Sequence, residues 1–262
     1  MPAPALELLH VTRRFPPRDR RAQPFTAIER LNFSVAPGEF VALVGPSGCG
    51  KSTVLNLVAG LDRPSEGQVF VSGEEVSGAN AHVGFMLQKD LLLPWRSIRR
   101  NVEFGLENRG LSADERRSRV ARELTRCRLT DYADRYPHQL SGGQRQRAAL
   151  ARTLAIEPSV VLLDEPFSAL DAQTKLLLQK SFAETIATSG ITTLLITHDL
   201  TEAVAMADRI LVMSERPGRI VEELAIDLPH RDNPIARQAL PRARDFIAHL
   251  FQALHLDDRI DA

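Results

Sequence analysis

The sequence has few of the features that build disulfide-bonded, metal-bound or membrane-spanning proteins. Cys49 and Cys127 are its only cysteines, and their number and spacing exclude a disulfide framework or a cysteine-based metal site. No apolar run approaches the roughly 18 residues that a membrane-spanning helix needs. The N-terminal residues also lack the basic flank, apolar core and cleavage site of a secretory signal. The sequence therefore predicts a cytosolic protein, at most peripheral to a membrane.

An excess of charge of either sign is also missing. Lys+Arg and Asp+Glu both number 33, which gives a formal net charge of zero. Since a global basic field is absent, nucleic acid is not expected as a partner. At 262 residues, 44% hydrophobic and 25% charged, the chain is typical of a soluble protein with one large α/β domain, with or without an inserted subdomain.

A glycine-rich segment between an expected strand and an expected helix is the strongest positive signal. The letters GPSGCGKST follow the apolar run at 40–44 and precede the helix-compatible run at 53–59, which is the full G-x-x-x-x-G-K-[ST] pattern in its required context. Its glycines let successive N–H groups point at phosphate oxygens, Lys51 is expected to reach the β- and γ-phosphates, and the Ser52 hydroxyl is expected to bind Mg²⁺. The predicted phosphate-binding residues are Gly45, Pro46, Ser47, Gly48, Cys49, Gly50, Lys51, Ser52 and Thr53.

The remaining chain alternates between strand and helix patterns. The expected strands cover residues 6–12, 26–35, 40–44, 68–72, 82–87, 159–163, 192–196, 209–213 and 219–224. The expected helices cover residues 53–59, 97–106, 112–129, 141–156 and 233–256. An Arg- and Pro-rich insert at 13–24 separates the first two strands. Because residues 89–157 contain no convincing strand, they predict a helical subdomain inserted between two strands of the main sheet.

Acidic residues and a histidine follow two of the apolar strands. Asp164 and Glu165 end the run at 159–163, and His198 follows the run at 192–196. The carboxyl ends of parallel strands meet at one edge of a sheet, beside a phosphate loop. We expect Asp164 to hold Mg²⁺, Glu165 to deprotonate the attacking water, and His198 to bond the γ-phosphate and that water.

A second candidate anion site lies at residues 141–143. Ser141 is an N-cap residue type, and Gly142 and Gly143 would leave the first N–H groups of the following helix open. On its own this signal is weak, because Ser-Gly-Gly also occurs in ordinary loops.

Three further features each allow two interpretations, and Cys49 adds a separate prediction. Phe15 either offers a flat face on which a purine stacks or packs into the sheet. Trp95 and the leucines before it form either subdomain core or an exposed patch for a partner. The apolar face of 233–256 packs either on the core or across a dimer. Cys49 stands at a helix N-terminus, where thiolate is favoured, which predicts a reactive thiol that nucleotide protects.

Together these motifs resemble the ATP-binding subunit of ABC transporters, in the family's order and over nearly all of the chain. Residues 45–53 resemble the Walker A motif, Gln88 the Q-loop, LSGGQRQR from Leu140 the signature, VVLLDEP from Val160 the Walker B motif with its catalytic glutamate, Ser168 to Asp171 the D-loop, and His198 the switch histidine. The resemblance implies an α/β P-loop NTPase (ABC ATPase) fold with a RecA-like core, an antiparallel β subdomain and an inserted helical subdomain. The implied divisions are 1–88 with 158–230 as nucleotide-binding core, 89–157 as helical signature subdomain and 231–262 as C-terminal helical extension.

The resemblance also implies how the site is assembled. In that family two subunits enclose two ATP molecules, the signature of one meeting the Walker A motif of the other. The implied residues for the partner's nucleotide are Ser141, Gly142, Gly143, Gln144 and Asp171. The implied catalytic residues are Glu165, His198 and Gln88, and the implied Mg²⁺ ligands are Ser52, Gln88 and Asp164. Phe15 stands where the family usually stacks adenine on a tyrosine.

Flanking segments narrow the resemblance. Two segments are similar to importer subunits of the nitrate, sulfonate and taurine group: LQKDLLLPWRSIRRNVEFGL and MSERPGRIVEEL. Subunits of that group work with a separate permease and an extracytoplasmic solute-binding protein. This implies an ATPase on the cytoplasmic face of the inner membrane that powers uptake of a small anion. A soluble ABC ATPase acting on DNA or ribosomes usually has a long coiled-coil insert or a second cassette, which are missing here. A dimerisation module without turnover would not need both Glu165 and His198.

Overall fold

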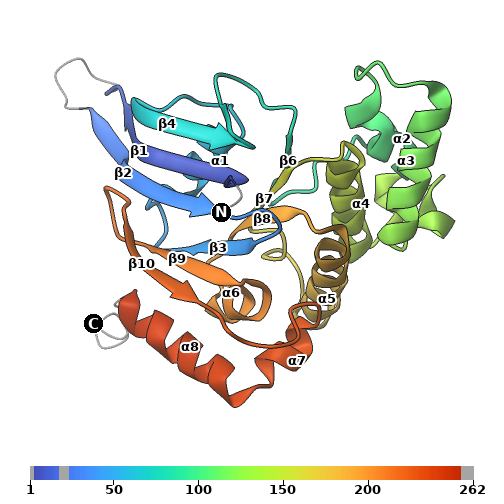
Figure 1. Ribbon diagram of the computed structural model, residues 1–262. Helices are drawn as coiled ribbons and strands as arrows, with labels where there is room; N and C mark the ends of the chain where they lie inside the picture. The colour runs from blue at the N-terminus through green and yellow to red at the C-terminus, as the bar shows by residue number, and fades with distance from the viewer. Residues whose placement is uncertain (1–2, 18–23, 255–262) are drawn as a thin grey trace.

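Two sheets form the centre of the molecule in the computed structural model, which describes residues 3–17 and 24–254 (Figure 1). The larger sheet has the strand order β10-β9-β3-β8-β7-β6. Its strands are β3 (Phe40–Val44), β6 (Val83–Met86), β7 (Val160–Asp164), β8 (Thr192–Ile196), β9 (Arg209–Met213) and β10 (Ile220–Ala225). All neighbours in this sheet pair in parallel except β10, which is antiparallel to β9 at the edge. Strand β3, which precedes the phosphate loop, lies inside this sheet, with β9 on one side and β8 on the other.

The smaller sheet is antiparallel, with the order β2-β1-β4-β5. Its strands are β1 (Leu6–Phe15), β2 (Phe25–Val35), β4 (Glu66–Val71) and β5 (Glu74–Glu75). Strand β1 is longer than the expected 6–12 and ends at Phe15, which pairs with Phe25 across the ladder. The expected insert at 13–24 is shorter for this reason, because cross-strand pairing extends β1 through its arginines. Residues 18–23 of the insert lie outside the described residues.

Both faces of the larger sheet are covered, which explains its continuous apolar runs. On β3, Phe40, Ala42 and Val44 belong to a core shared with the helices, whereas Val41 and Leu43 belong to a core shared with the smaller sheet and α1 (Lys51–Val58). Side chains of a strand alternate between faces, so both sets have to be apolar. The expected α/β fold with an antiparallel β layer is confirmed.

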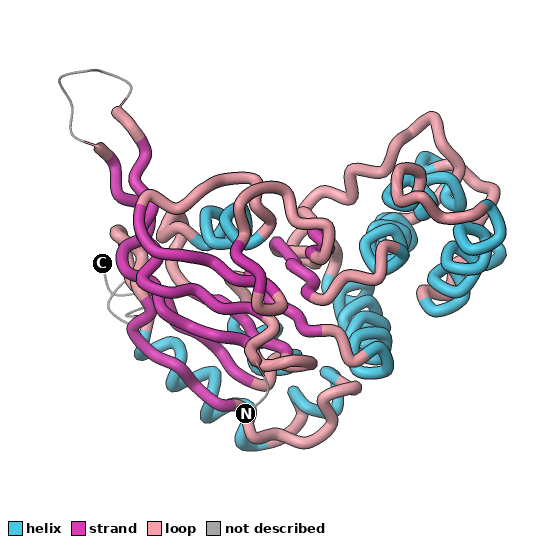
Figure 2. The backbone as a smooth tube through the Cα atoms, turned by 45° about the horizontal axis from the view of Figure 1, so that its top comes forward, coloured by secondary structure: helices cyan, strands magenta, loops and turns pink. Residues whose placement is uncertain are grey.

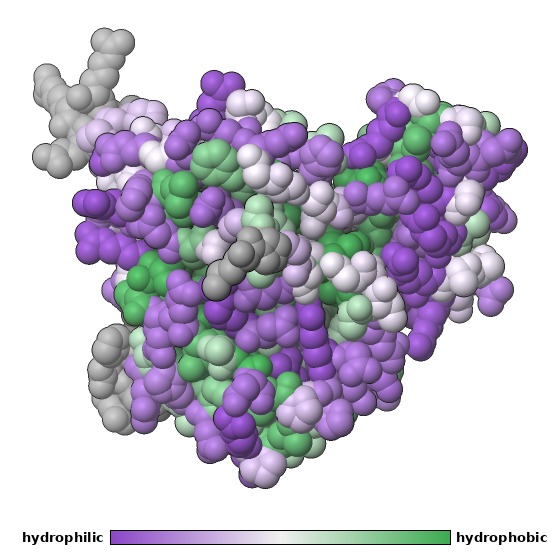
Figure 3. All heavy atoms as spheres, viewed as in Figure 1, coloured by the Kyte–Doolittle hydropathy of each residue, from purple (hydrophilic) through white to green (hydrophobic). Residues whose placement is uncertain are grey.

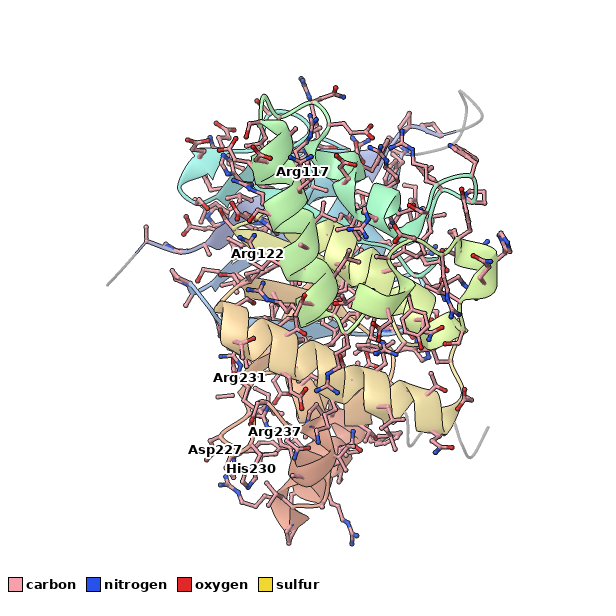
Figure 4. All side chains as sticks on the ribbon, turned by 90° about the vertical axis from the view of Figure 1, so that its right-hand side faces the viewer. Arg117, Arg122, Asp227, His230, Arg231 and Arg237 are labelled. Carbon is pink, nitrogen blue, oxygen red and sulfur yellow. The ribbon has the colours of Figure 1, made fainter. Side chains whose placement is uncertain are left out.

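A helical region lies between β6 and β7, to one side of the sheets (Figures 1 and 2). It consists of α2 (Ile98–Glu103), η1 (Phe104–Leu106), α3 (Ala113–Arg126), η2 (Thr130–Tyr132), η3 (Pro137–Gln139) and α4 (Gly142–Ala155). Ser112 and Ser141 are the N-caps of α3 and α4, and each forms a capping box. The exterior of this region is mostly hydrophilic (Figure 3), and Arg117 and Arg122 line the outside of α3 (Figure 4). Its expected insertion between two strands is confirmed.

The last part of the chain packs on the core. After α5 (Ala172–Ser189) and α6 (Leu200–Met206), the tail forms α7 (Pro234–Gln238) and α8 (Pro241–Ala253). The expected single helix over 233–256 is wrong, because the residue before Pro241 is extended, as a proline requires.

Buried contacts hold this tail in place. The guanidinium of Arg237 is buried and donates to the carbonyls of Ala205 at 3.5 Å and Ile226 at 3.1 Å (Figure 4). Leu250 of α8 is fully buried in the same core as α6. Of the two interpretations of the apolar face, the structure supports packing on the core. Within the described residues, no helix combines the length and apolar character needed to cross a membrane.

Candidate functional site

A glycine-rich loop joins β3 to α1 at the carboxyl edge of the larger sheet. Gly50, the N-cap of α1, has a φ of 105°, a conformation that residues with a Cβ rarely adopt. A Cβ there would lie 2.5 Å from Cγ2 of Ile28 on β2. Among the described residues no side chain caps α1, and its first turn has no acidic residue. The first N–H groups of α1 thus remain open to an anion.

Lys51 is the first residue of α1, and its ammonium lies against the loop. The side chain is only 8% exposed, and Nζ donates to the carbonyls of Gly45 at 2.7 Å and Pro46 at 3.0 Å. Within the described residues these contacts do not include an ion pair with a carboxylate. A mostly buried cation whose hydrogen bonds go to neutral carbonyl groups favours an anionic ligand.

A cavity of about 300 Å³ opens over the loop. Its lining residues are Phe15, Phe25, Ala27, Ser47, Gly48, Gly50, Lys51, Ser52, Thr53, Glu165, Ile196 and Arg216. The cavity therefore brings together the residues predicted for base stacking, phosphate binding and general-base catalysis. Phe15 is half-buried, with the guanidinium of Arg13 4.5 Å from its ring centroid. Its place in the cavity wall favours the stacking interpretation over packing into the sheet.

Glu165 and His198 lie within ion-pair distance of each other at the same edge. The Glu165 backbone has a φ of 45°, and its N–H donates to the carbonyl of Ile196 at 2.9 Å. Glu165 Oε2 lies 3.1 Å from His198 Nδ1, with side chains 26% and 63% exposed. His198 also lines an adjoining cavity of about 220 Å³ with Gly45 and Ser47. A carboxylate oriented by a histidine beside a phosphate loop suits activation of a water molecule.

Asp164 ends β7 and is half-buried. Burial raises the pKa of its carboxyl group, and the neighbouring charge of Glu165 raises it further, while Lys51 acts in the opposite direction. The described residues contain no cluster of three or more His, Cys, Asp or Glu side chains that could hold a metal. The Asp164 carboxylate and the Ser52 hydroxyl in the cavity wall are oxygen ligands of the kind that Mg²⁺ prefers. Two such residues fit a Mg²⁺ ion that would take its other ligands from phosphate and water.

Replacing Asp164 is expected to separate stability from function. The pKa of Asp164 is higher in the folded than in the unfolded protein, so its ionised carboxylate destabilises the folded protein at pH values above the folded-state pKa. This destabilisation disappears at pH values below the ordinary carboxyl pKa, where Asp164 is protonated in both states. Asp164→Asn should therefore raise the Tm of the nucleotide-free protein at pH 7, by an amount that shrinks toward about pH 4. Mg²⁺-dependent nucleotide binding and turnover should fall together. Thermal unfolding across this pH range, with and without MgATP, measures both, and a lowered Tm or intact Mg²⁺ dependence would contradict the assignment.

Gln88 is not brought to the phosphate loop. Its Nε2 donates to Ser168 Oγ at 3.0 Å, and Ser168 Oγ donates to the carbonyl of Glu165 at 3.0 Å. Gln88 lines a different cavity of about 470 Å³, which includes Gly142. The roles of Gln88 as Mg²⁺ ligand and catalytic residue stay predictions.

The Ser-Gly-Gly segment lies apart from the phosphate loop. Ser141 Oγ accepts from the N–H of Gln144 at 3.3 Å, and Gln144 Oε1 accepts from the N–H of Ser141 at 2.9 Å. Ser141 and Gly143 line a fourth cavity, of about 450 Å³, with basic residues including Arg147. Because this cavity shares no lining residue with the one over the phosphate loop, the two halves of the predicted ATP site face different spaces in one chain.

Asp171 of the expected D-loop caps α5. Its Oδ1 accepts from the N–H of Thr174 at 2.9 Å, and this hydrogen bond lowers the pKa of the carboxyl group. The negative charge of Asp171 is thereby held at the N-terminus of α5, where the positive end of the helix dipole stabilises it. Its contact with a partner's nucleotide stays a prediction.

The structure corrects the expectation for Cys49 and adds residues that the sequence analysis missed. Cys49 is only 1% exposed, with Sγ 3.8 Å from Lys51 Nζ, so the expected reactive thiol is not accessible. Phe25 and Arg216 line the cavity over the phosphate loop but were not predicted. The pairing of Phe25 with Phe15 and the parallel pairing of β9 with β3 place them there. A search for aromatic residues at strand ends and for basic residues in the loops that follow strands could have found both.

Comparison with known proteins gives a consistent picture. The family profile described as ABC transporter matches residues 28–168. The chain is 45% identical to the nitrate import ATP-binding protein NrtD of Synechocystis over 203 residues, which are 78% of this chain and 76% of NrtD. It is 43% identical to the aliphatic sulfonates import ATP-binding protein SsuB 1 of Xanthomonas axonopodis pv. citri over 228 residues, 86% of this chain and 90% of SsuB 1. The taurine import ATP-binding protein TauB of Yersinia pestis is 43% identical over 205 residues, 78% of this chain and 80% of TauB.

A solved structure supports the fold. The ATP-binding cassette MJ0796, a dimer in a post-hydrolysis state bound to ADP and phosphate, superposes with a TM-score of 0.71 at 32% sequence identity. The match covers 84% of this chain and 98% of that one.

Proposed function

This chain belongs to the ABC transporter family and is one of its ATP-hydrolysing subunits, and we propose that it powers import of a small anion of the nitrate, sulfonate or taurine type through a separate permease. The observation that carries this proposal is the identity of 43–45% to nitrate, sulfonate and taurine import ATP-binding proteins over more than three quarters of the chain. A solute-binding protein outside the membrane would complete the system, and the subunit would act at the cytoplasmic face.

The proposed chemistry follows from the cavity over the phosphate loop. The loop and Lys51 would hold the phosphates of ATP, Phe15 would offer its ring to the base, and Ser52 and Asp164 would hold Mg²⁺. When bound, Mg²⁺ supplies charge neutralisation to the phosphoryl oxygens. Glu165, oriented by His198, accepts the proton of the attacking water. The division of the chain into core 1–88 with 158–230, helical subdomain 89–157 and extension 231–262 stays part of this proposal.

Proposed docking to the permease involves a loop before α2. Trp95 is 72% exposed and Leu91 is 54% exposed. Asn101, which is fully buried, accepts from the N–H of Leu93 at 2.7 Å and donates to the carbonyl of Arg96 at 3.0 Å. These bonds fix the loop that presents Trp95. An exposed tryptophan on a rigid loop favours a partner contact over the core interpretation.

Trp95→Ala is expected to weaken assembly with the permease while leaving the isolated subunit folded. Because the ring is mostly exposed, its loss should change the Tm of the subunit little, unlike the loss of about 3–5 kcal/mol expected for a core aromatic. Co-purification with the permease measures assembly, and Leu61→Ala, at a residue 64% exposed, is the matched control. Equal retention of the permease by wild type and Trp95→Ala would refute the docking role.

The import class itself can be tested by deleting the gene. Growth on nitrate as nitrogen source, and on taurine or an alkanesulfonate as sulfur source, should fail for one of these solutes and recover on complementation. Unchanged uptake of all of them would contradict the proposed solute class, and a DNA-repair or translation defect would favour a soluble ABC ATPase.

A further inference from the structure

The loop between β9 and β10 lies beside the phosphate loop. Strand β9 is parallel to β3, so both strands end at the same edge of the sheet. The N–H of Gly218 donates to the carbonyl of Ala27, and the N–H of Glu29 donates to that of Gly218, each at 3.0 Å. A Cβ on Gly218 would lie 2.0 Å from the carbonyl oxygen of Cys49. The loop is thus attached to β2 and packed against the phosphate loop at once.

Arg216 extends from this loop into the nucleotide cavity. Its Nε donates to the carbonyl oxygen of Gly48. The guanidinium carbon lies 5.0 Å from the ring centroid of Phe25, and the side chain lines the cavity together with Lys51 and Ser52. The residue contributes a second cation to this cavity, at a different place from the carbonyls that Lys51 binds.

The charge of Arg216 is not neutralised by a carboxylate within the part of the chain that the structure describes. Its neighbour Arg219 differs, because that guanidinium is paired with Glu29. A guanidinium has five N–H donors. In Arg216 one of them, the Nε–H, is used in the hydrogen bond to the carbonyl oxygen of Gly48. The remaining N–H donors form a planar set that fits the oxygens of a phosphate group.

We propose that Arg216 binds a phosphate oxygen of the nucleotide, bridging it to the carbonyl of Gly48 in the phosphate loop. This inference rests on the proposed binding of ATP in the cavity. Phe15 and Phe25 are cross-strand partners and line the same cavity, so Arg216, stacked on Phe25, lies toward the base. Arg216 therefore contacts the α- or β-phosphate and not the γ-phosphate. Because ADP has both of these phosphates, Arg216 binds ADP as well as ATP.

Equilibrium binding of MgADP to the full chain tests this proposal, since ADP is neither hydrolysed nor bridged to a second subunit. Arg216→Gln is expected to weaken MgADP binding about tenfold, the effect of one charge-assisted phosphate contact. Arg216→Lys, which keeps the charge, should recover most of the affinity. The loss in Arg216→Gln should also shrink as the salt concentration rises, because salt screens an exposed ion pair. Arg219→Gln, in the same loop but paired with Glu29, should bind as wild type does.

Two outcomes would overturn the assignment. If Arg216→Gln binds MgADP as tightly as wild type, Arg216 makes no phosphate contact. If Gln and Lys weaken binding equally and independently of salt, Arg216 only supports the loop through Gly48. Lys51→Ala separates these results from failure of the proposed site: it should lose MgADP binding in every case, and unchanged binding would place the nucleotide elsewhere.

Discussion

Glu165→Gln is expected to lower ATP turnover by about 10²–10⁴-fold, the range of a lost general base, while ATP binding remains. The structure supports this because Glu165 lines the cavity over the phosphate loop and its Oε2 lies 3.1 Å from His198 Nδ1. Glutamine keeps the shape of the side chain but cannot accept the proton of the attacking water. It also removes one negative charge beside the γ-phosphate, which should strengthen ATP binding.

Single-turnover hydrolysis and equilibrium ATP binding measure the two effects separately. Glu66→Gln is the control, because Glu66 forms an exposed ion pair with Arg14 on the smaller sheet and should not alter turnover. His198→Ala should lower turnover by a smaller factor, since Glu165 remains as base but loses its orienting partner. A Glu165→Gln protein that hydrolyses ATP at the wild-type rate would falsify the assignment of the base.

Local patterns were sufficient to predict most of the fold. Strands β3, β7 and β8 were predicted from their apolar runs, because a strand covered on both faces needs apolar residues throughout. The starts of α3 and α4 were predicted to within one residue, and the capping boxes that Ser112 and Ser141 form there are local interactions. The phosphate loop was predicted from its glycines, since their backbone conformation is closed to other residues.

Features that depend on distant segments could not be predicted. Arg216 contacts Gly48 across 168 residues, and Gln88 contacts Ser168 across 80 residues. Strand β1 continues to Phe15 because β2 pairs with it, which propensity alone does not reveal. Cys49 is buried because Gly218 packs against its backbone and Met213 belongs to the same apolar core. In each case the determining partner is supplied by the tertiary fold.

The signature segment is incomplete as a binding site within one chain. Ser141 and Gly143 line a cavity that shares no residue with the cavity over the phosphate loop. The N–H groups of Gly142 and Gly143 begin α4, whose N-terminal end carries partial positive charge. We therefore expect an ATP molecule on Lys51 to meet this charge from a second copy of the chain. The dimeric arrangement of the related cassette MJ0796 supports such an assembly.

Ser141→Arg added to Glu165→Gln is expected to abolish the ATP-driven dimer that Glu165→Gln alone should form, because the bulky cation blocks α4 from the partner's γ-phosphate. The change also removes an N-cap, which costs about 1 kcal/mol. Ser112→Arg in the Glu165→Gln background is therefore the matched control: it removes the same capping box from α3 and should still dimerise. Gel filtration with saturating ATP distinguishes the variants. A dimer that persists in the Ser141→Arg double variant, or its loss in the Ser112→Arg one, would rule out the shared site.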